Sequence, residues 1–230
     1  MTSITPTSQA LLNRYEAVKK NFAGADVPWL SAIRDASAAA FRTQGLPTPR
    51  VEDWKYTNLK ALDKIGLDGH ASADVRAEDL PERAGAGPRL VFVGGRYRGD
   101  LSHSGALTTG VRFSHVAGLL KSDQDLIEEC LADTGDGTPL LALNGAFQED
   151  GYALILEETA LVDGLVEVLH VNAGAAVSQP RNIIAVGAGA RVRLLQTHMG
   201  TGTTTQFFNG ATMVNVDEGA KVEHLRHQIQ

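Results

Sequence analysis

One short charged segment, residues 50–59, holds two of the chain's few large aromatic side chains. The candidate functional residues there are Arg50, Trp54, Lys55 and Tyr56. Trp and Tyr each combine an apolar ring with a polar tip, and a cation placed over such a ring is attracted to it. These side chains suit either a packing contact that anchors the segment or a surface that binds a partner. Both interpretations stay open at this point.

The remaining residue types that could bind a metal or attack a substrate form no convincing site. His224 and His227 stand three residues apart, which places them on opposite faces of a strand and argues against a metal pair. We interpret His224 as a hydrogen-bonded histidine in the interior or at a corner. Cys130 follows two glutamates, and neighbouring acids raise a thiol pKa, so we expect no reactive thiolate.

Motifs for catalysis and cofactor binding are also missing from the sequence. No Gly-x-Ser-x-Gly elbow is present, and Gly187-Ala188-Gly189 lacks the third glycine of a dinucleotide loop. The single cysteine excludes an internal disulfide and does not supply the thiolates that hold an iron–sulfur cluster or a structural zinc. The search for a catalytic or cofactor-binding site in the sequence is therefore mostly negative, and we expect this segment alone to bind no cofactor.

Amphipathic patterns place these residues on a few short elements. Apolar spacing predicts one helix over residues 8–22 with Ser8 as its N-cap, and another over 28–43 that Gly45 ends. Further helical and strand patterns cover residues 123–132, 140–147, 90–93 and 111–113. Residues 68–88, rich in Gly, Ala, Pro and charge, predict a linker or irregular connection.

Near the end of the chain, one pattern occurs three times at a spacing of 30 residues (184 − 154 and 214 − 184). In each copy an apolar strand leads to a polar or glycine corner, and then to Ala160, Ala190 or Ala220, where a second strand begins. A repeat of this length cannot close a core alone and predicts stacked units from about residue 151. The domains expected are 1–85 (helical region with linker), 86–150 (mixed strand and helix entry) and 151–230 (repeats).

Composition limits the possible partners and compartments. The chain is 43% hydrophobic, 21% charged and carries a formal charge of −6, with no basic run, so we expect no nucleic-acid partner. No stretch is apolar over the length of a membrane span, and the N-terminus lacks a secretory signal. We expect a cytoplasmic protein without a membrane partner.

Several motifs in order resemble the SufD branch of the SufB/SufD family, which serves the SUF system of iron–sulfur cluster assembly. The resemblance rests on Arg50–Leu59, on Leu90–Gly95 followed by Leu101-Ser102, on Leu143–Phe147 with Asp150-Gly151, on Pro180–Asn182 and on Gly219–Gln228. The SufB branch shares the β-helix of the SufD branch, so both branches remain open, and the N-terminal motif favours SufD.

This resemblance implies a fold and a role. The expected fold is mixed α and β, mainly β, with an N-terminal helical region followed by an incomplete right-handed parallel β-helix. The expected role is a non-catalytic scaffold that contacts SufB-like and SufC-like subunits, with an iron–sulfur cluster or flavin present only in the full complex. Because the sequence ends inside a repeat, it is expected to be a fragment without the C-terminal part of the family.

Two alternatives remain from other functional classes. A carbohydrate-active enzyme would carry paired carboxylates on neighbouring strands, whereas the matched outward positions are Leu161, Arg191 and Lys221. A purely structural, oligomerising module would associate through the strand edge that an open stack leaves unpaired. Whichever function is correct, we expect the chain to self-associate if this strand edge stays unpaired.

Overall fold

The computed structural model describes residues 4–64, 74–131, 137–173, 177–201 and 206–229. Within these ranges the α-helices are α1 (Pro6–Val18), α2 (Pro28–Gln44), α3 (Val116–Ser122), α4 (Gln124–Leu131) and α5 (Pro139–Phe147). Short 3-10 turns are η1 (Lys19–Asn21), η2 (Glu52–Trp54), η3 (Leu59–Lys64) and η4 (Ala77–Asp79). The strands are β1 (Arg89–Val93), β2 (Arg96–Tyr97), β3 (Val111–His115), β4 (Tyr152–Leu156), β5 (Leu161–Ala173), β6 (Val177–Ser178), β7 (Arg181–Val186), β8 (Arg191–Thr201), β9 (Phe207–Phe208), β10 (Ala211–Val216) and β11 (Lys221–Ile229).

The two N-terminal helices lie close to where their patterns predict them. Thr5, and not Ser8, caps α1, because the Thr5 hydroxyl accepts the Ser8 amide. The Ser8 hydroxyl instead accepts the amide of Leu46 at 2.9 Å and ties the end of α2 to α1. Helix α2 begins with Pro28 and ends at Gly45, whose φ of 66° favours glycine, so this prediction is confirmed.

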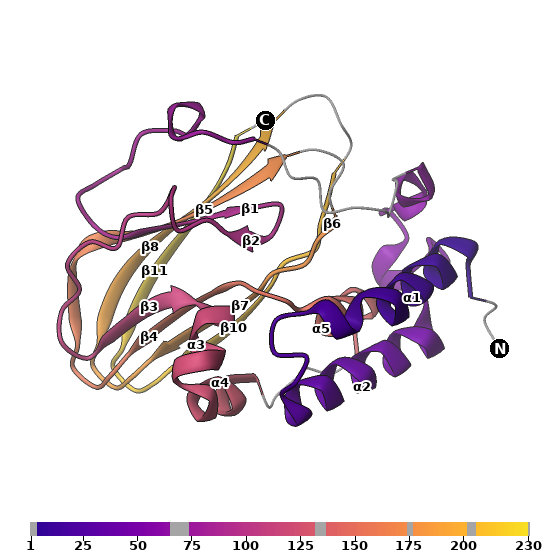
Figure 1. The fold of residues 1–230 in the computed structure, drawn as a ribbon, viewed down its shortest axis with the longest axis horizontal. Helices are drawn as coiled ribbons and strands as arrows, with labels where there is room; N and C mark the ends of the chain where they lie inside the picture. Colours follow the sequence, from indigo (N-terminus) through magenta and orange to yellow (C-terminus); the bar gives the residue numbers. More distant parts are fainter. Residues whose placement is uncertain (1–3, 65–73, 132–136, 174–176, 202–205, 230) are drawn as a thin grey trace.

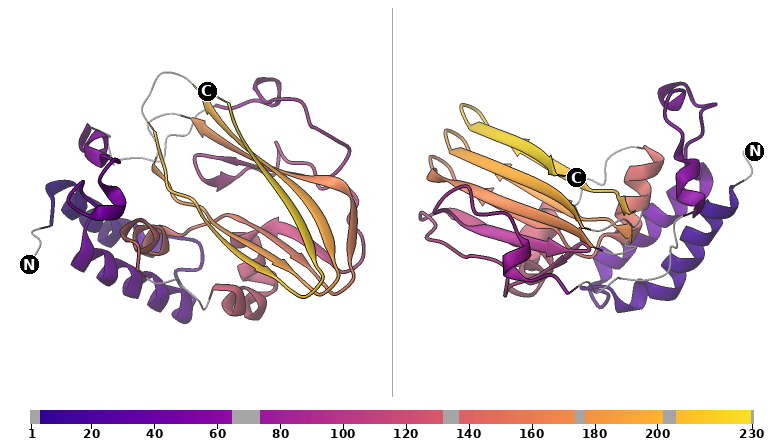
Figure 2. Two further views of the ribbon diagram at one scale, coloured as in Figure 1. Left: turned by 180° about the vertical axis from the view of Figure 1, so that it is seen from behind. Right: turned by 90° about the horizontal axis from the view of Figure 1, so that it is seen from above.

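The strands form two larger sheets that face each other. One sheet has the order β11-β8-β5-β1-β2, and the other has the order β10-β7-β4-β3. From β4 onward, the longer strands β4, β5, β7, β8, β10 and β11 alternate between the two sheets. Figure 1 and the right-hand view of Figure 2 show the sheets stacked beside the group formed by α1, α2 and α5.

Residues that are 30 positions apart in the repeat pair with each other on neighbouring strands. Ile184 pairs with Leu154 on one side and with Val214 on the other, and all three strands run parallel. In the second sheet Val192 pairs with Val222 at the same spacing. Equivalent residues of the repeat therefore lie side by side, which confirms that the repeat stacks.

The predicted fold class, an incomplete right-handed parallel β-helix, is wrong. The structure is an α/β fold whose sheets mix parallel and antiparallel strands, and mixed α and β describes it only in part. Antiparallel pairs join β1 to β2 and β3 to β4. β1, β2 and β3 come from residues 89–115, outside the repeat, and only β4 belongs to it. The repeat pattern therefore contained no information about the direction of these pairings.

The apolar core lies between the two sheets, and further clusters join the helices to them. Side chains of β1, β4, β5, β7 and β8 fill the space between the sheets, with Phe92, Tyr152, Leu154 and Val166 fully buried. Helices α3 and α4 cover the outer face of β4 and β7 by packing on Ala153 and Ile183. Helices α1, α2 and α5 share a separate cluster that includes Leu11, Phe41 and Leu143.

Two buried arginines connect these parts. Arg34 of α2, 2% exposed, donates from Nε and Nη2 to the Gln148 carbonyl at 3.0 and 2.7 Å. Arg89 pairs with Glu167 at 3.2 Å and donates to the carbonyls of Pro81 and Glu82. The described part of the predicted linker, 74–88, is thus an irregular connection held against β1 and β5, while 65–73 lie outside the described residues.

Candidate protein-binding surface

Residues 50–57, hereafter the ridge, are held mainly by local turns. The amides of Trp54 and Thr57 donate to the carbonyls of Val51 and Trp54, each at 2.9 Å. The amide of Lys55 donates to the Glu52 carbonyl at 3.1 Å and closes η2. Hydrogen bonds between residues three positions apart fix the backbone of the ridge without burying its side chains. Figure 2 shows this part of the chain projecting beyond the N-terminal helices.

The four candidate residues lie at the surface. Tyr56 is 93% exposed, Arg50 and Lys55 are exposed, and Trp54 is half-buried. The Lys55 ammonium lies 5.6 Å from the centre of the Tyr56 ring, so the structure brings these two residues together. Tyr56 does not anchor the ridge to the rest of the domain. Its ring is instead available for contact.

A groove of about 450 Å³ adjoins the ridge. Pro49 and Asn58, which flank the ridge in the chain, both line it. The opposite wall comes from the start of α1 and the groove continues to η3, with Pro6, Leu46, Pro47 and Leu59 among its apolar residues. A projecting aromatic beside an apolar groove is an arrangement typical of protein interfaces.

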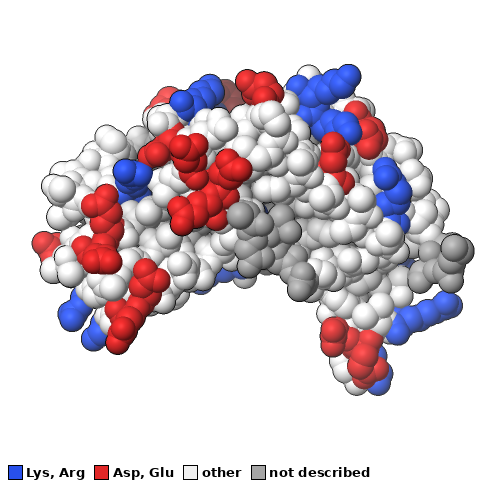
Figure 3. Space-filling model, turned by 90° about the horizontal axis from the view of Figure 1, so that it is seen from below, with Lys and Arg blue, Asp and Glu red and all other residues white. Residues whose placement is uncertain are grey.

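Charge on the surface is mixed. In Figure 3, Lys and Arg are interspersed with Asp and Glu over the face seen from below. On the ridge itself, Lys55 lies 3.9 Å from Glu52, and both side chains are largely exposed. Interspersed charges of this kind favour specific protein contacts over the uniform phosphate backbone of a nucleic acid.

Buried histidines that the repeat pattern did not reveal lie between the sheets. His170 stacks on His198 with ring centres 4.9 Å apart and on Phe92 at 5.3 Å. Burial lowers the pKa of His170 well below its usual value, and burial followed by the Arg226 charge lowers that of His198 to about 4. Both rings are therefore neutral near pH 7.

The spacing of these histidines explains why they escaped detection. The pairing of β5 with β8 shifts between Leu161 and Leu165, after which partners are 28 residues apart, as in His170 and His198 (198 − 170). When the sequence is aligned with itself at a spacing of 30 residues, His170 and His198 do not fall at equivalent positions. His224 is exposed, and its Nε2 lies 3.0 Å from Gln196 Oε1, so the hydrogen bond is confirmed and the interior position is not.

The described residues contain no cluster of three or more His, Cys, Asp or Glu side chains that could hold a metal. Cys130 has a raised thiol pKa, chiefly through burial and then through Glu129. Leu161, Arg191 and Lys221 pair across three neighbouring strands, so no carboxylates meet at that position. Within the described ranges, no helix combines the length and apolar character that crossing a bilayer requires.

Comparison with known proteins assigns the N-terminal part of the chain. Residues 5–68 match the family model described as SufBD protein N-terminal region. This match supports membership of the SufB/SufD family and a role in iron–sulfur cluster assembly. It does not distinguish SufD from SufB. No curated protein matches the chain.

The matched region includes the whole ridge and the groove beside it. Its helices α1 and α2 bury their apolar faces against α5, while the ridge leaves Tyr56 and Val51 at 93% and 48% exposure. Within this one region, the helices have a structural role, and the ridge has side chains that the fold itself does not use.

Proposed function

We propose that this protein is a non-catalytic scaffold subunit of an iron–sulfur cluster assembly complex, of the SufD type, and that it contacts SufB-like and SufC-like subunits. The single observation that carries the proposal is the exposed Tyr56, with Lys55 over its ring, inside the region that matches the SufBD model. Exposed Tyr and Trp side chains contribute large contact areas at little conformational cost. The ridge is the contact that we assign.

Burial keeps two histidines and the single cysteine in their neutral forms. His170 and His198 are buried and neutral, and the raised pKa of the Cys130 thiol keeps it protonated near pH 7. We propose that a cluster or flavin in the complex is bound by residues of other subunits or of other parts of the protein. The role proposed for these residues is to position partners.

Self-association is a second contact that the strand edges favour. β10 and β11 each pair on one side only within the described ranges, and Leu225 is 66% exposed. Unpaired strand edges with apolar side chains are templates for association. We propose that these edges bring copies of the chain, or a subunit with a similar edge, into contact.

Co-purification from the host organism tests the proposed function. The protein, tagged and expressed at its natural level, is expected to carry SufB-like and SufC-like subunits, identified by mass spectrometry. A parallel purification of the Tyr56→Ala variant is expected to carry less of them. Recovery of the protein without any SUF subunit, at native expression and low salt, would contradict the proposal.

A further inference from the structure

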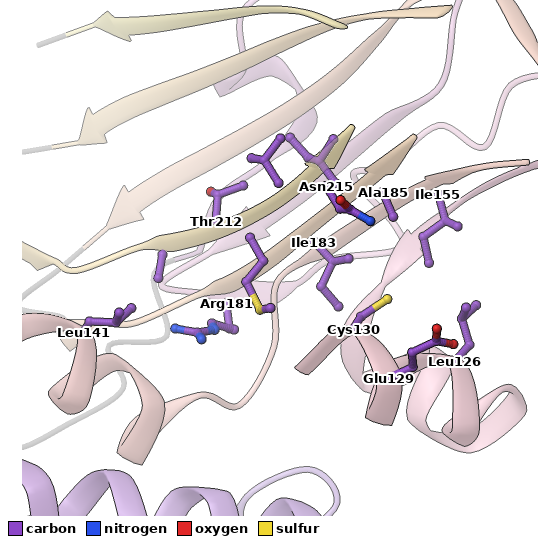
Figure 4. Close-up of a pocket in the computed structure, with 14 residues that line it drawn as sticks. Leu126, Glu129, Cys130, Leu141, Ile155, Arg181, Ile183, Ala185, Thr212 and Asn215 are labelled. Carbon is purple, nitrogen blue, oxygen red and sulfur yellow. The ribbon is translucent and has the colours of Figure 1, made fainter. Parts of the chain in front are cut away.

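A groove of about 640 Å³ lies on the outer face of the second sheet, away from the ridge. Its floor is formed by β7 and β10, one wall by α4, and one end by Leu141 of α5. Figure 4 shows Leu126, Glu129 and Cys130 of α4 opposite Ile155 and Ile183 of the strands. None of the residues that line the groove belongs to the matched region 5–68 or to the ridge.

The groove exists because helix coverage of this sheet is incomplete. α3 and α4 bury Ala153 and Ile183 on the outer face, to 0% and 2% exposure. The next residue in the same row, Met213 of β10, is only partly buried. Apolar side chains beyond α4 thus form a floor that no described helix covers.

The size of the groove is within the range of small-molecule pockets. Its volume is about 640 Å³. Pockets for small molecules typically measure about 300–1,000 Å³ and are mostly apolar with a few polar groups.

The two ends of the groove differ in the charge they offer. At the α5 end, Arg181 is 4% exposed and donates to Asn144 Oδ1 at 3.3 Å. At the α4 end, Glu129 is exposed, and in the described part of the chain it forms no ion pair. The raised thiol pKa of Cys130 keeps the wall between them uncharged. A cation at the α4 end would meet Glu129 with an apolar surface beside it.

We propose that this groove binds an apolar small molecule that carries an amine, with the hydrocarbon part over Ala185 and Met213, which are only partly buried, and the ammonium at Glu129. Binding buries apolar surface that is now exposed to water, which supplies the main driving force. The ion pair with Glu129 then orients the molecule.

Displacement of a fluorescent apolar probe, N-phenyl-1-naphthylamine, tests this proposal. Decylamine is expected to displace the probe about fivefold more effectively than decanoate, a ratio suited to one partly exposed ion pair. The Ala185→Phe variant, which places a ring on the groove floor, is expected to weaken probe binding at least about tenfold. The Glu129→Gln variant is expected to keep probe binding and lose the preference for the amine.

Two controls separate the groove from other apolar surface. Leu225→Ser removes exposed apolar surface at the strand edge and is expected to leave probe binding unchanged. Circular dichroism and thermal unfolding test whether Ala185→Phe is folded. Glu129→Gln changes an exposed helix position, and its loss of the preference for decylamine is a second readout that does not depend on Ala185→Phe. Failure of the probe to bind, its loss in Leu225→Ser, or equal displacement by decylamine and decanoate in the wild type would each overturn the proposal.

Discussion

Equivalent residues in two neighbouring layers of the repeat differ sharply in exposure. Ile184 and Val186 of β7 are 1% and 2% exposed, whereas Val214 and Val216 of β10, paired with them in register, are 56% and 43% exposed. The residue types are nearly the same, and each pair shares one face of the sheet. The difference shows that the repeat determines the register and face of a side chain, while the next layer determines its burial.

The same contrast appears within the N-terminal region. α1 and α2 bury Leu11 and Phe41 almost completely, and the ridge leaves Tyr56 in solvent. Exposed apolar and aromatic side chains thus occur at the last strands and on the ridge. Such side chains contribute little to the stability of the fold and remain available for contacts.

The matched pair Val186 and Val216 gives the largest expected difference. Val186→Ala removes two buried methyl groups and leaves a cavity, at a cost of about 2 kcal/mol in the free energy of unfolding. Val216→Ala is expected to cost about 0.5 kcal/mol or less, because its side chain remains in water after folding. Denaturant unfolding of both variants measures the two values. Equal costs would show that a further layer covers β10 in solution.

Acid is expected to affect the interior layer through its histidines. In the unfolded chain a histidine takes up a proton near pH 6.5, while folded His198, with a pKa of about 4, and folded His170, with a strongly lowered pKa, stay neutral. The unfolded state therefore binds more protons, and stability falls as the pH drops from about 6.5 to about 4. His198 alone should account for a loss of up to about 3 kcal/mol over this range, and His170 adds to the loss in the same direction.

The His170→Phe variant tests this origin of the acid sensitivity. His170 already stacks on Phe92 and His198, so a phenyl ring fits the same apolar surroundings. Urea unfolding at several pH values should show a smaller loss of stability in His170→Phe. Val186→Ala, destabilised for a different reason, should keep the full loss. An unchanged pH dependence in His170→Phe would assign the effect to other groups.

The strand edge yields the smallest effect on stability and a clear effect on association. Leu225→Lys places a charge on the exposed edge of β11 and should weaken self-association about tenfold or more without altering unfolding. Leu161→Lys is a matched control, because Leu161 is 49% exposed on an interior strand. Sedimentation velocity over a concentration series compares them. A wild-type chain that stays monomeric throughout would remove this contact from the account.

Local patterns predicted the elements that depend on local sequence. Helix α2 follows from its apolar spacing, Pro28 and Gly45, and the parallel register follows from the 30-residue repeat. The antiparallel strands β2 and β3 did not follow, because their partners are chosen by contacts with distant strands. The expected parallel β-helix failed for the same reason: the repeat carries no information on residues 89–115.

The candidate site was predictable in part. The residue types on the ridge indicated a surface for packing or partners, but only the structure shows that Tyr56 is exposed. The sequence of α2 is compatible with a solvent-exposed Arg34. In the structure Arg34 is buried and donates hydrogen bonds to the carbonyl of Gln148, which lies 114 residues away in the chain. The groove beside α4 depends on how far the helices extend across the sheet, and no local pattern encodes that.

Direct binding to purified SUF subunits is the most direct test of the central claim, that this protein acts through contacts made by the ridge. Isothermal titration calorimetry of the protein against the SufB-like and SufC-like proteins of its host is expected to show binding. Tyr56→Ala should weaken that binding about tenfold or more, and the control Leu161→Ala should not. Absence of binding by the wild type, or equal affinity of Tyr56→Ala and wild type, would contradict the account.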